Sequence, residues 1–215
     1  MQVIYLLPAF DFTPTMLFKL KATFLFLAIA FSANAQIFKT ASGSLESIEG
    51  IERYNVIFEY AENLEVPKYE SEHVFLELYG KKKDKKEVGS GEVFKNLWFS
   101  NREKLFEPKF IQEFNFFNLK EKQVTIAKNI TDAKYTIVVR TSLIDPGNSN
   151  FFFKKDARLE VTIQVYRSDN PNEILYATEM VDVHSRGASK NDYDRIMSAY
   201  AELGRGLSKH LSRKT

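Results

Sequence analysis

Two stretches, Lys134–Ile144 (KYTIVVRTSLI) and Ala157–Arg167 (ARLEVTIQVYR), decide the fold of this chain. Apolar and polar residues alternate in both stretches, as a strand with one buried face requires. The residues that the alternation places on the apolar face include Ile137, Val139, Val161 and Ile163. The two stretches therefore predict an antiparallel hairpin that buries this face.

The register of the hairpin follows from the same alternation. Directly opposed residues of an antiparallel pair lie on one face of the sheet. We expect Val139 opposite Ile163 and Leu143 opposite Leu159. Shifts by two residues keep the faces and change the partners, whereas a shift by one would bury Arg140 and is excluded.

The first 35 residues contain the pattern of an export signal. Two lysines precede the apolar stretch Ala22–Phe31, which is followed by small residues up to Ala35. This pattern is typical of a signal peptide, here residues 16–35, with cleavage after Ala35. Ten apolar residues are too few to span a bilayer, which needs about 20. An uncleaved anchor is the competing interpretation, and either Met1 or Met16 is the true start.

Composition narrows the class of protein further. The chain has no cysteine, so it can carry neither a disulfide framework nor a lipid on a cysteine after the signal. Removing the first 35 of 215 residues leaves 180, the size of one domain with its own core. Because 30 basic and 28 acidic residues nearly balance, no nucleic-acid partner is expected. These features predict a periplasmic or secreted protein with no integral membrane span after cleavage.

The rest of the chain predicts a loose lead-in over residues 36–52 and a single α+β domain over residues 53–212. We expect a sheet of about five strands, mostly antiparallel or mixed, with helices packed on it in the order β-α-α-β-β-β-β-α. Besides the hairpin, the alternation predicts strands over 54–60, 124–127 and 174–183. The last of these is apolar on both sides and is expected to be covered on both.

Helical spacing predicts helices over 71–79, 92–117 and 192–211. Ser71 is the expected N-cap of the first. The second is expected as two helices or one kinked near Glu107, with Ser100 and Glu103 as a capping box. Its aromatic residues are expected to pack in the core: Trp98, Phe106, Phe110, Phe114 and Phe117. In the third, Gly204 is best explained by a close approach to the sheet.

A dense lysine run interrupts the pattern. Gly80–Gly91 (GKKKDKKEVGSG) has five lysines in six positions, Lys81–Lys86. The run lacks the aromatic residues of a nucleic-acid site, and like charges at this density repel one another. We therefore expect a solvated loop in preference to a phosphate-binding site.

The sequence carries no motif that indicates an enzyme or a metal site. The three histidines lack metal-ligand spacing, and no HExxH motif is present. Asp182, His184 and Ser185 include the residue types of a hydrolase triad, but adjacent strand residues point to opposite faces and cannot relay a proton. No glycine-rich phosphate loop and no GxSxG motif occurs. We expect no cofactor, no metal and no catalysis.

The loop of the hairpin, Asp145–Asp156 (DPGNSNFFFKKD), is the candidate contact site. Three consecutive phenylalanines cannot all face one side of a strand. Either the rings cap the edge of the sheet, or they dock a partner, since exposed aromatic residues are preferred contact anchors. The candidate partner-contact residues are Phe151, Phe152, Phe153, Lys154 and Lys155.

Several segments also carry a resemblance to known proteins. They are Asp132–Val139, the arginine-bearing strand Ala157–Val165, Asn170-Pro171 ahead of Ile174-Leu175, and Ala199–Gly204. The chain resembles a family of small exported proteins of unknown function from Gram-negative bacteria. More distantly, it is similar to the periplasmic α/β modules of the curli-secretion lipoprotein, the TolB amino-terminal domain and the penicillin-binding-protein activator lipoproteins. The resemblance implies partner binding and no catalytic residue, and the missing cysteine departs from the lipoprotein members.

Together these features predict an exported, non-catalytic binding or scaffolding protein of the cell envelope whose partner is an envelope protein. The alternative is a periplasmic enzyme or small-ligand binder, with a pocket between the aromatic helices and the sheet.

Overall fold

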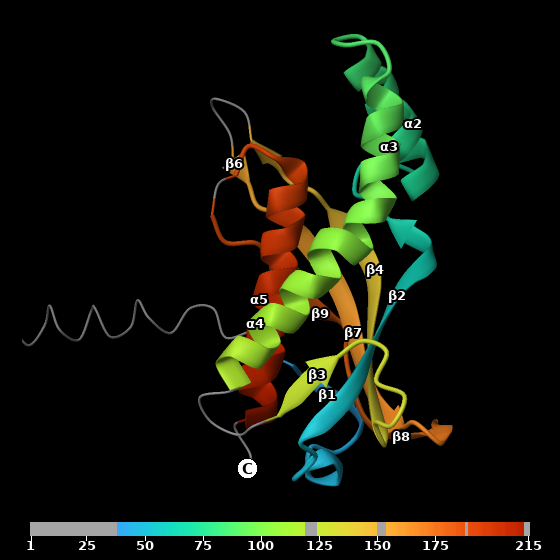
Figure 1. Ribbon diagram of the computed structural model, residues 1–215. Helices are drawn as coiled ribbons and strands as arrows, with labels where there is room; N and C mark the ends of the chain where they lie inside the picture. Colours follow the sequence, from blue (N-terminus) through green and yellow to red (C-terminus); the bar gives the residue numbers. More distant parts are fainter. Residues whose placement is uncertain (1–37, 119–123, 150–153, 188, 213–215) are drawn as a thin grey trace, which may run out of the picture. The chain divides into compact units, whose positions relative to one another are not determined.

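The structure is a computed structural model that describes residues 38–118, 124–149, 154–187 and 189–212 (Figure 1). The chain divides into two compact units, Met1–Ala35 and Gln36–Thr215, and every described residue belongs to the second. The predicted signal peptide therefore lies outside the described residues. No helix among the described residues has the length and apolar character needed to cross a membrane.

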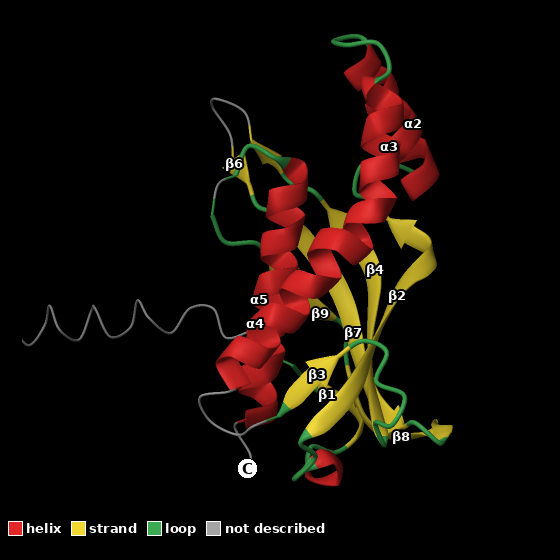
Figure 2. Cartoon of the chain, in the orientation of Figure 1, coloured by secondary structure: helices red, strands yellow, loops and turns green. Residues whose placement is uncertain are grey.

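A mixed sheet runs through the described unit (Figure 2). Over the described residues it has seven strands in the order β1-β8-β7-β4-β2-β3, and β9 pairs with β7 beside this path. β2 is parallel to β3 and β4, whereas the other pairs are antiparallel. The strands are β1 (Thr40–Gly43), β2 (Arg53–Glu65), β3 (Thr125–Ala127), β4 (Tyr135–Asp145), β7 (Arg158–Arg167), β8 (Asn170–Thr178) and β9 (Val181–His184). The predicted α+β class is confirmed.

The helices occupy two places. α4 (Glu107–Asn118) and α5 (Asp192–Ser212) lie against one face of the sheet (Figure 2). α2 (Glu72–Asp84) and α3 (Ser90–Asn101) form a helical hairpin, and α3 continues into α4 through the π-helical segment Arg102–Phe106. A short 3-10 helix, Glu46–Ile48, follows β1.

The central hairpin of β4 and β7 buries the face that the sequence predicts. Val139 lies opposite Ile163 as expected. Four side chains of that face are fully buried: Ile137, Val139, Val161 and Ile163. The predicted pairing of Leu143 with Leu159 is wrong, because a bulge after Thr141 shifts the ladder and places Ile144 opposite Leu159. Ile144, at 0 % exposed, takes over the core face from that point.

The described part of residues 36–52 is not loose. β1 pairs with β8 in the main sheet, and Phe38 and Ile48 are buried in the core. Gly43 has a φ of +68°, and a Cβ there would lie 2.0 Å from the carbonyl oxygen of Leu175. The small residues of this stretch thus permit close contact between β1 and β8, and the described part is not the loose lead-in that the sequence predicts.

The first helix is longer than predicted. Ser71 is its N-cap, as expected, and its Oγ accepts a hydrogen bond from the Val74 amide at 3.2 Å. The helix continues through Gly80 to Asp84, so the loop predicted over 80–91 is helical in its first part. Lysine propagates a helix well, and cations in the last turn face the negative end of the helix dipole.

The aromatic stretch 92–117 forms two helices, as predicted, and the π-helical segment Arg102–Phe106 joins them just before Glu107. Buried in the core are Trp98, Phe106, Phe110 and Phe114. Phe117 is only half-buried. The predicted capping box is wrong, because Ser100 lies inside α3 and the chain continues through the π-helical segment without a new helix start.

The strand predicted over 174–183 is two strands, β8 and β9, and both pair with β7. The predicted coverage on both sides holds only at Tyr176–Thr178, which are all buried, and is wrong at Ile174 (43 % exposed) and Met180 (55 % exposed). The physical reason is that α4 and α5 cover the same face of the sheet (Figure 2).

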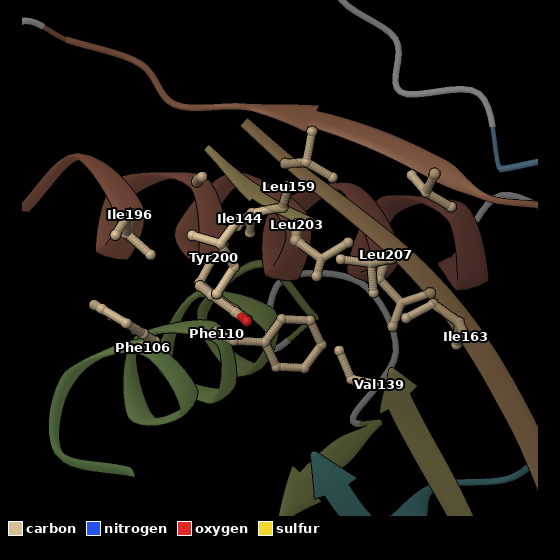
Figure 3. Close-up of a cluster of buried hydrophobic side chains, with 14 of the residues drawn as sticks. Phe106, Phe110, Val139, Ile144, Leu159, Ile163, Ile196, Tyr200, Leu203 and Leu207 are labelled. Carbon is tan, nitrogen blue, oxygen red and sulfur yellow. The ribbon is translucent and has the colours of Figure 1, made fainter. Parts of the chain in front are cut away.

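α5 closes the core as its spacing predicts. Its apolar stripe packs against α4 and the sheet (Figure 3). The fully buried members of the stripe are Ile196, Tyr200, Leu203 and Leu207. Gly204 allows close approach to α4 instead of the sheet, because a Cβ there would lie 2.4 Å from the carbonyl oxygen of Phe110.

Candidate functional site

Two hairpins leave the same end of the sheet. β2 and β4 are parallel neighbours, so their carboxyl ends meet at one edge. β2 leads into the helical hairpin of α2 and α3, and β4 leads into a strand hairpin of β5 (Asn148–Ser149) and β6 (Lys154–Lys155) (Figure 1). We call this region the hairpin end and define it by residues 72–101, 145–149, 154–155 and 189–195.

Asp145 fixes the base of the strand hairpin. Its carboxylate accepts hydrogen bonds from the Gly147 amide at 2.9 Å and from Lys155 Nζ at 2.5 Å. Gly147 has a φ of +69°, and a Cβ there would lie 2.3 Å from the carbonyl oxygen of Lys155. The turn thus requires glycine, and the stem of the hairpin is held in one geometry.

Of the five predicted contact residues, Lys154 and Lys155 are described. Both are exposed on β6, which pairs with β5. Phe151, Phe152 and Phe153 lie outside the described residues. Whether their rings cap the sheet edge or dock a partner stays a prediction.

A buried arginine, which we call the Arg195 latch, connects the two hairpins to the start of α5. Arg195 is 2 % exposed and donates to the Pro146 carbonyl at 2.8 Å and the Ser189 carbonyl at 2.9 Å. It also donates to Asp192 Oδ1 at 2.5 Å, while the Tyr79 hydroxyl of α2 donates to Asp192 Oδ2 at 3.0 Å. Burial, together with Asp192, raises the pKa of Tyr79 to about 12. One cation therefore couples the base of the strand hairpin to α5 and, through Asp192, to α2.

The α2–α3 hairpin packs around an aromatic cluster. The cluster contains Tyr69, Phe75, Tyr79, Phe94 and Trp98. The two helices approach closely at Gly91, where a Cβ would lie 2.5 Å from the Gly80 carbonyl oxygen. Tyr193 of α5 donates to the Phe94 carbonyl at 2.9 Å and ties α3 to α5. The side chains on the inner side of the α2–α3 hairpin are therefore engaged in packing between the two helices and against α5.

The outer sides of the same hairpin carry exposed apolar residues. They are Leu78 (52 % exposed), Val88 (96 %), Val93 (57 %), Leu97 (41 %) and Phe99 (48 %). They make up five of the nine large exposed hydrophobic residues among those described, so this kind of side chain concentrates at the hairpin end. A concentration of exposed apolar side chains is typical of a contact surface.

The root of the α2–α3 hairpin is fixed at the π-helical segment. Arg102 donates to Glu72 Oε1, which also accepts from Trp98 Nε1 at 2.5 Å. The Arg102 guanidinium lies over the Tyr60 ring at 4.1 Å and near the Phe99 ring at 5.0 Å. π-helical turns are frequent at functional sites, and this one orients an arginine that joins α2, α3 and β2.

A further polar cluster lies where β2 and β4 meet α4 and α5. Glu107 is 3 % exposed, pairs with Lys128 and accepts from the Tyr60 hydroxyl at 3.4 Å. Burial raises the pKa of Tyr60 well above its usual value. Tyr200 shares a hydrogen bond of 2.8 Å with Thr141, and burial raises the pKa of Tyr200 to about 12. These groups are partnered by one another, which is the arrangement of a structural network.

The sequence-level triad does not assemble. His184 and Asp182 lie 3.4 Å apart on the exposed side of β9. Ser185 is buried, and its hydroxyl accepts from the Ala157 amide at 2.9 Å. Among the described residues, no group of three or more His, Cys, Asp or Glu side chains could hold a metal ion.

Sequence reasoning missed the residues that hold the hairpin end together, namely Asp145, Asp192 and Arg195. The Asp-Pro-Gly turn after β4 could have indicated Asp145, since aspartate often caps the turn that follows it. Nothing in the local pattern marks Arg195, which stands beside a core residue and is buried by segments distant in the sequence.

Comparisons with known proteins add little to this picture. No protein-family model and no curated protein matches the sequence. Among solved structures, a PelC dodecamer from Paraburkholderia phytofirmans is similar with a TM-score of 0.40 and 10 % identity, over 83 % of this chain and 98 % of that chain. A Xanthomonas campestris protein of the DUF330 family is similar with a TM-score of 0.41 and 8 % identity, over 83 % of this chain and 91 % of that chain. At this level the similarity carries no inference about function.

Proposed function

We propose that the protein is an exported, non-catalytic binding or scaffolding module of the cell envelope that contacts its partners through the hairpin end. The observation that carries the proposal is the concentration of exposed apolar side chains on α2 and α3. Their inner faces already satisfy the packing of the hairpin, so the outer residues are not needed for the core. Export is supported by the signal-peptide pattern of residues 16–35.

The fixed geometry of the hairpin end supports the same proposal. A surface held rigid before binding loses less conformational freedom on binding than a mobile one. The Arg195 latch, the Asp145 turn and the Arg102 root each restrain one part of this region. The contact residues on β6 and on α2–α3 are thereby held in a defined relation to each other.

The alternative was a pocket between the aromatic helices and the sheet. In the structure, the rings of this region are in direct contact with their neighbours. Phe110 meets Phe58 of β2 at 5.4 Å between ring centroids, and Phe106 stacks on Tyr200 at 5.6 Å. This packing gives the small-ligand alternative no specific support.

The test compares two triple variants in the native envelope. Leu78→Ser, Val93→Ser and Leu97→Ser remove apolar side chains from the hairpin end. The matched control carries Ile57→Ser in β2, Ile174→Ser in β8 and Met180→Ser in the link between β8 and β9, at positions that are 37 %, 43 % and 55 % exposed. After crosslinking and affinity capture, the first variant should lose the neighbours of the wild-type chain, and the control should keep them.

Thermal melting of both variants completes the experiment. Both should melt close to the wild type, because substitutions at exposed positions change stability by only about 0.5 kcal/mol each. Equal loss of neighbours in the two variants, or no loss in either, would contradict the proposal. For Phe151–Phe153, a triple serine variant separates the open alternatives: lost neighbours at unchanged stability indicate docking, and lost stability indicates a cap.

A further inference from the structure

The tip of the α2–α3 hairpin joins positive charge to an exposed apolar side chain. Residues 81–88, which we call the lysine apex, contain Lys81, Lys82, Lys83, Lys85 and Lys86. All but Lys83 are exposed, and Val88 at the end of the apex is 96 % exposed, the most of any large hydrophobic residue among those described. The apex lies at the far end of a helical hairpin that extends from the sheet (Figure 1).

Folding explains only part of this charge. Lys81, Lys82 and Lys83 stand in the last turn of α2, where cations are favourable at the negative end of the helix dipole. Lys85 and Lys86 come after the helix, which ends at Asp84. Like charges at this density repel one another, and an anionic partner would relieve that repulsion.

The two acidic residues of the apex, Asp84 and Glu87, leave a net charge of +3 beside its five lysines. Asp84 accepts a hydrogen bond from the Gly91 amide at 2.8 Å, so its carboxylate is engaged with the start of α3. Lys83 lies over the rings of Tyr79 at 5.2 Å and Phe94 at 5.5 Å, which holds it against the hairpin. Every lysine of the apex except Lys83 is exposed, so most of the positive charge faces outward.

We propose that the lysine apex docks the protein on the anionic phospholipid headgroups of a membrane surface. Lysines next to such a surface are attracted to it, and an apolar side chain among them can enter the boundary between headgroups and acyl chains. The apex contains neither an arginine nor an aromatic residue, which are the groups that bind nucleic-acid bases and phosphates most specifically. This inference rests on the proposed envelope function and deepens it, because it adds a lipid surface to the contacts of the hairpin end.

The expected effect is large enough to measure. Each lysine near an anionic surface contributes about fivefold to the affinity, so removing three lowers it by on the order of 100-fold. The probe is a set of vesicles of phosphatidylcholine with phosphatidylglycerol, compared with pure phosphatidylcholine in a sedimentation assay. The protein is the unit Gln36–Thr215, which carries the whole described core and lacks the apolar stretch 22–31, since that stretch would itself bind lipid.

Three variants distinguish the effect of the apex lysines on vesicle binding from the effect of the protein's total charge. The apex variant is Lys81→Gln, Lys85→Gln and Lys86→Gln. The control variant is Lys39→Gln, Lys134→Gln and Lys209→Gln, which removes the same charge from exposed positions outside the hairpin end. Val88→Ser keeps every lysine and should weaken binding severalfold, because it removes the apolar contact.

The wild-type unit should bind the anionic vesicles, release them at high salt and ignore the neutral ones. The apex variant should lose vesicle binding, and its melting temperature should stay the same or rise. The control variant should keep most of the vesicle binding. Equal losses in the two triple variants, no wild-type binding, unchanged binding of Val88→Ser, or preference for a nucleic-acid or acidic-protein polyanion would each overturn the inference. None of these results would overturn the proposed function, whose test counts protein neighbours captured in the envelope.

Discussion

The α4–α5 layer and the α2–α3 hairpin are both built from helices rich in aromatic and aliphatic residues, yet they use them differently. In the layer, Phe110, Phe114 and Leu203 are all 0 % exposed. In the hairpin, Leu78, Val93 and Leu97 are 52 %, 57 % and 41 % exposed. Folding accounts for the apolar side chains that the layer buries, whereas the exposed ones of the hairpin make up the contact surface that we propose.

The largest expected effect comes from the layer. Phe110→Ala should destabilise the fold by about 3–5 kcal/mol, because it opens a cavity against Phe58 and the sheet. Phe116→Ala in the same helix is the control, since that ring is 54 % exposed, and it should cost about 0.5 kcal/mol. Denaturant unfolding measures both, and similar costs would remove the contrast between the core and the surface.

Next in size is the connection between the two regions. Arg195→Met should cost about 3 kcal/mol, because it leaves Asp192 and two carbonyl groups without their buried partner. Arg140→Met removes an exposed ion pair with Glu59 and should cost less than about 1 kcal/mol. If both variants unfold at the same denaturant concentration, the latch does not couple the hairpins to α5.

A smaller effect is expected at alkaline pH. The pKa of Tyr200 and the pKa of Tyr79 are each raised to about 12 from 10.0. An unfolded tyrosine loses its proton near pH 10, whereas the folded chain keeps it, so the stabilisation present below pH 10 is lost as the pH rises through 12. Tyr200→Phe should flatten this decline and cost about 1 kcal/mol at neutral pH through the lost bond to Thr141. Unfolding curves across the alkaline range test it, and an unchanged slope would contradict the buried environment of Tyr200.

The sequence predicted local structure well where the pattern was regular. Alternation from Tyr135 to Thr141 predicted the buried face of β4 and β7, and the preferred register holds for Val139 and Ile163. The pattern breaks at Leu143-Ile144, two adjacent apolar residues, and there the bulge was missed. The α5 stripe was found because its spacing is helical throughout.

What failed depends on contacts between distant segments. The parallel pairing of β2 with β4 has no local signal, and neither does the burial of Arg195. The lysine run was predicted as a loop from its charge, but helix propensity and the dipole at the end of α2 carried the helix into it. Of the predicted contact residues, Lys154 and Lys155 are placed at the hairpin end, and the role of Phe151–Phe153 stays a prediction.

The central claim is that the hairpin end is the contact surface of this protein. A photo-crosslinking amino acid placed in turn at Leu97 in α3, at Lys155 in β6 and at Ile57 in β2 tests it directly in the native envelope. Ile57 is the matched position, because it is an exposed apolar residue on the sheet, 37 % exposed against 41 % for Leu97. We predict adducts from positions 97 and 155 and none from position 57. Adducts from position 57 alone, or equal yields from all three positions, would contradict the account.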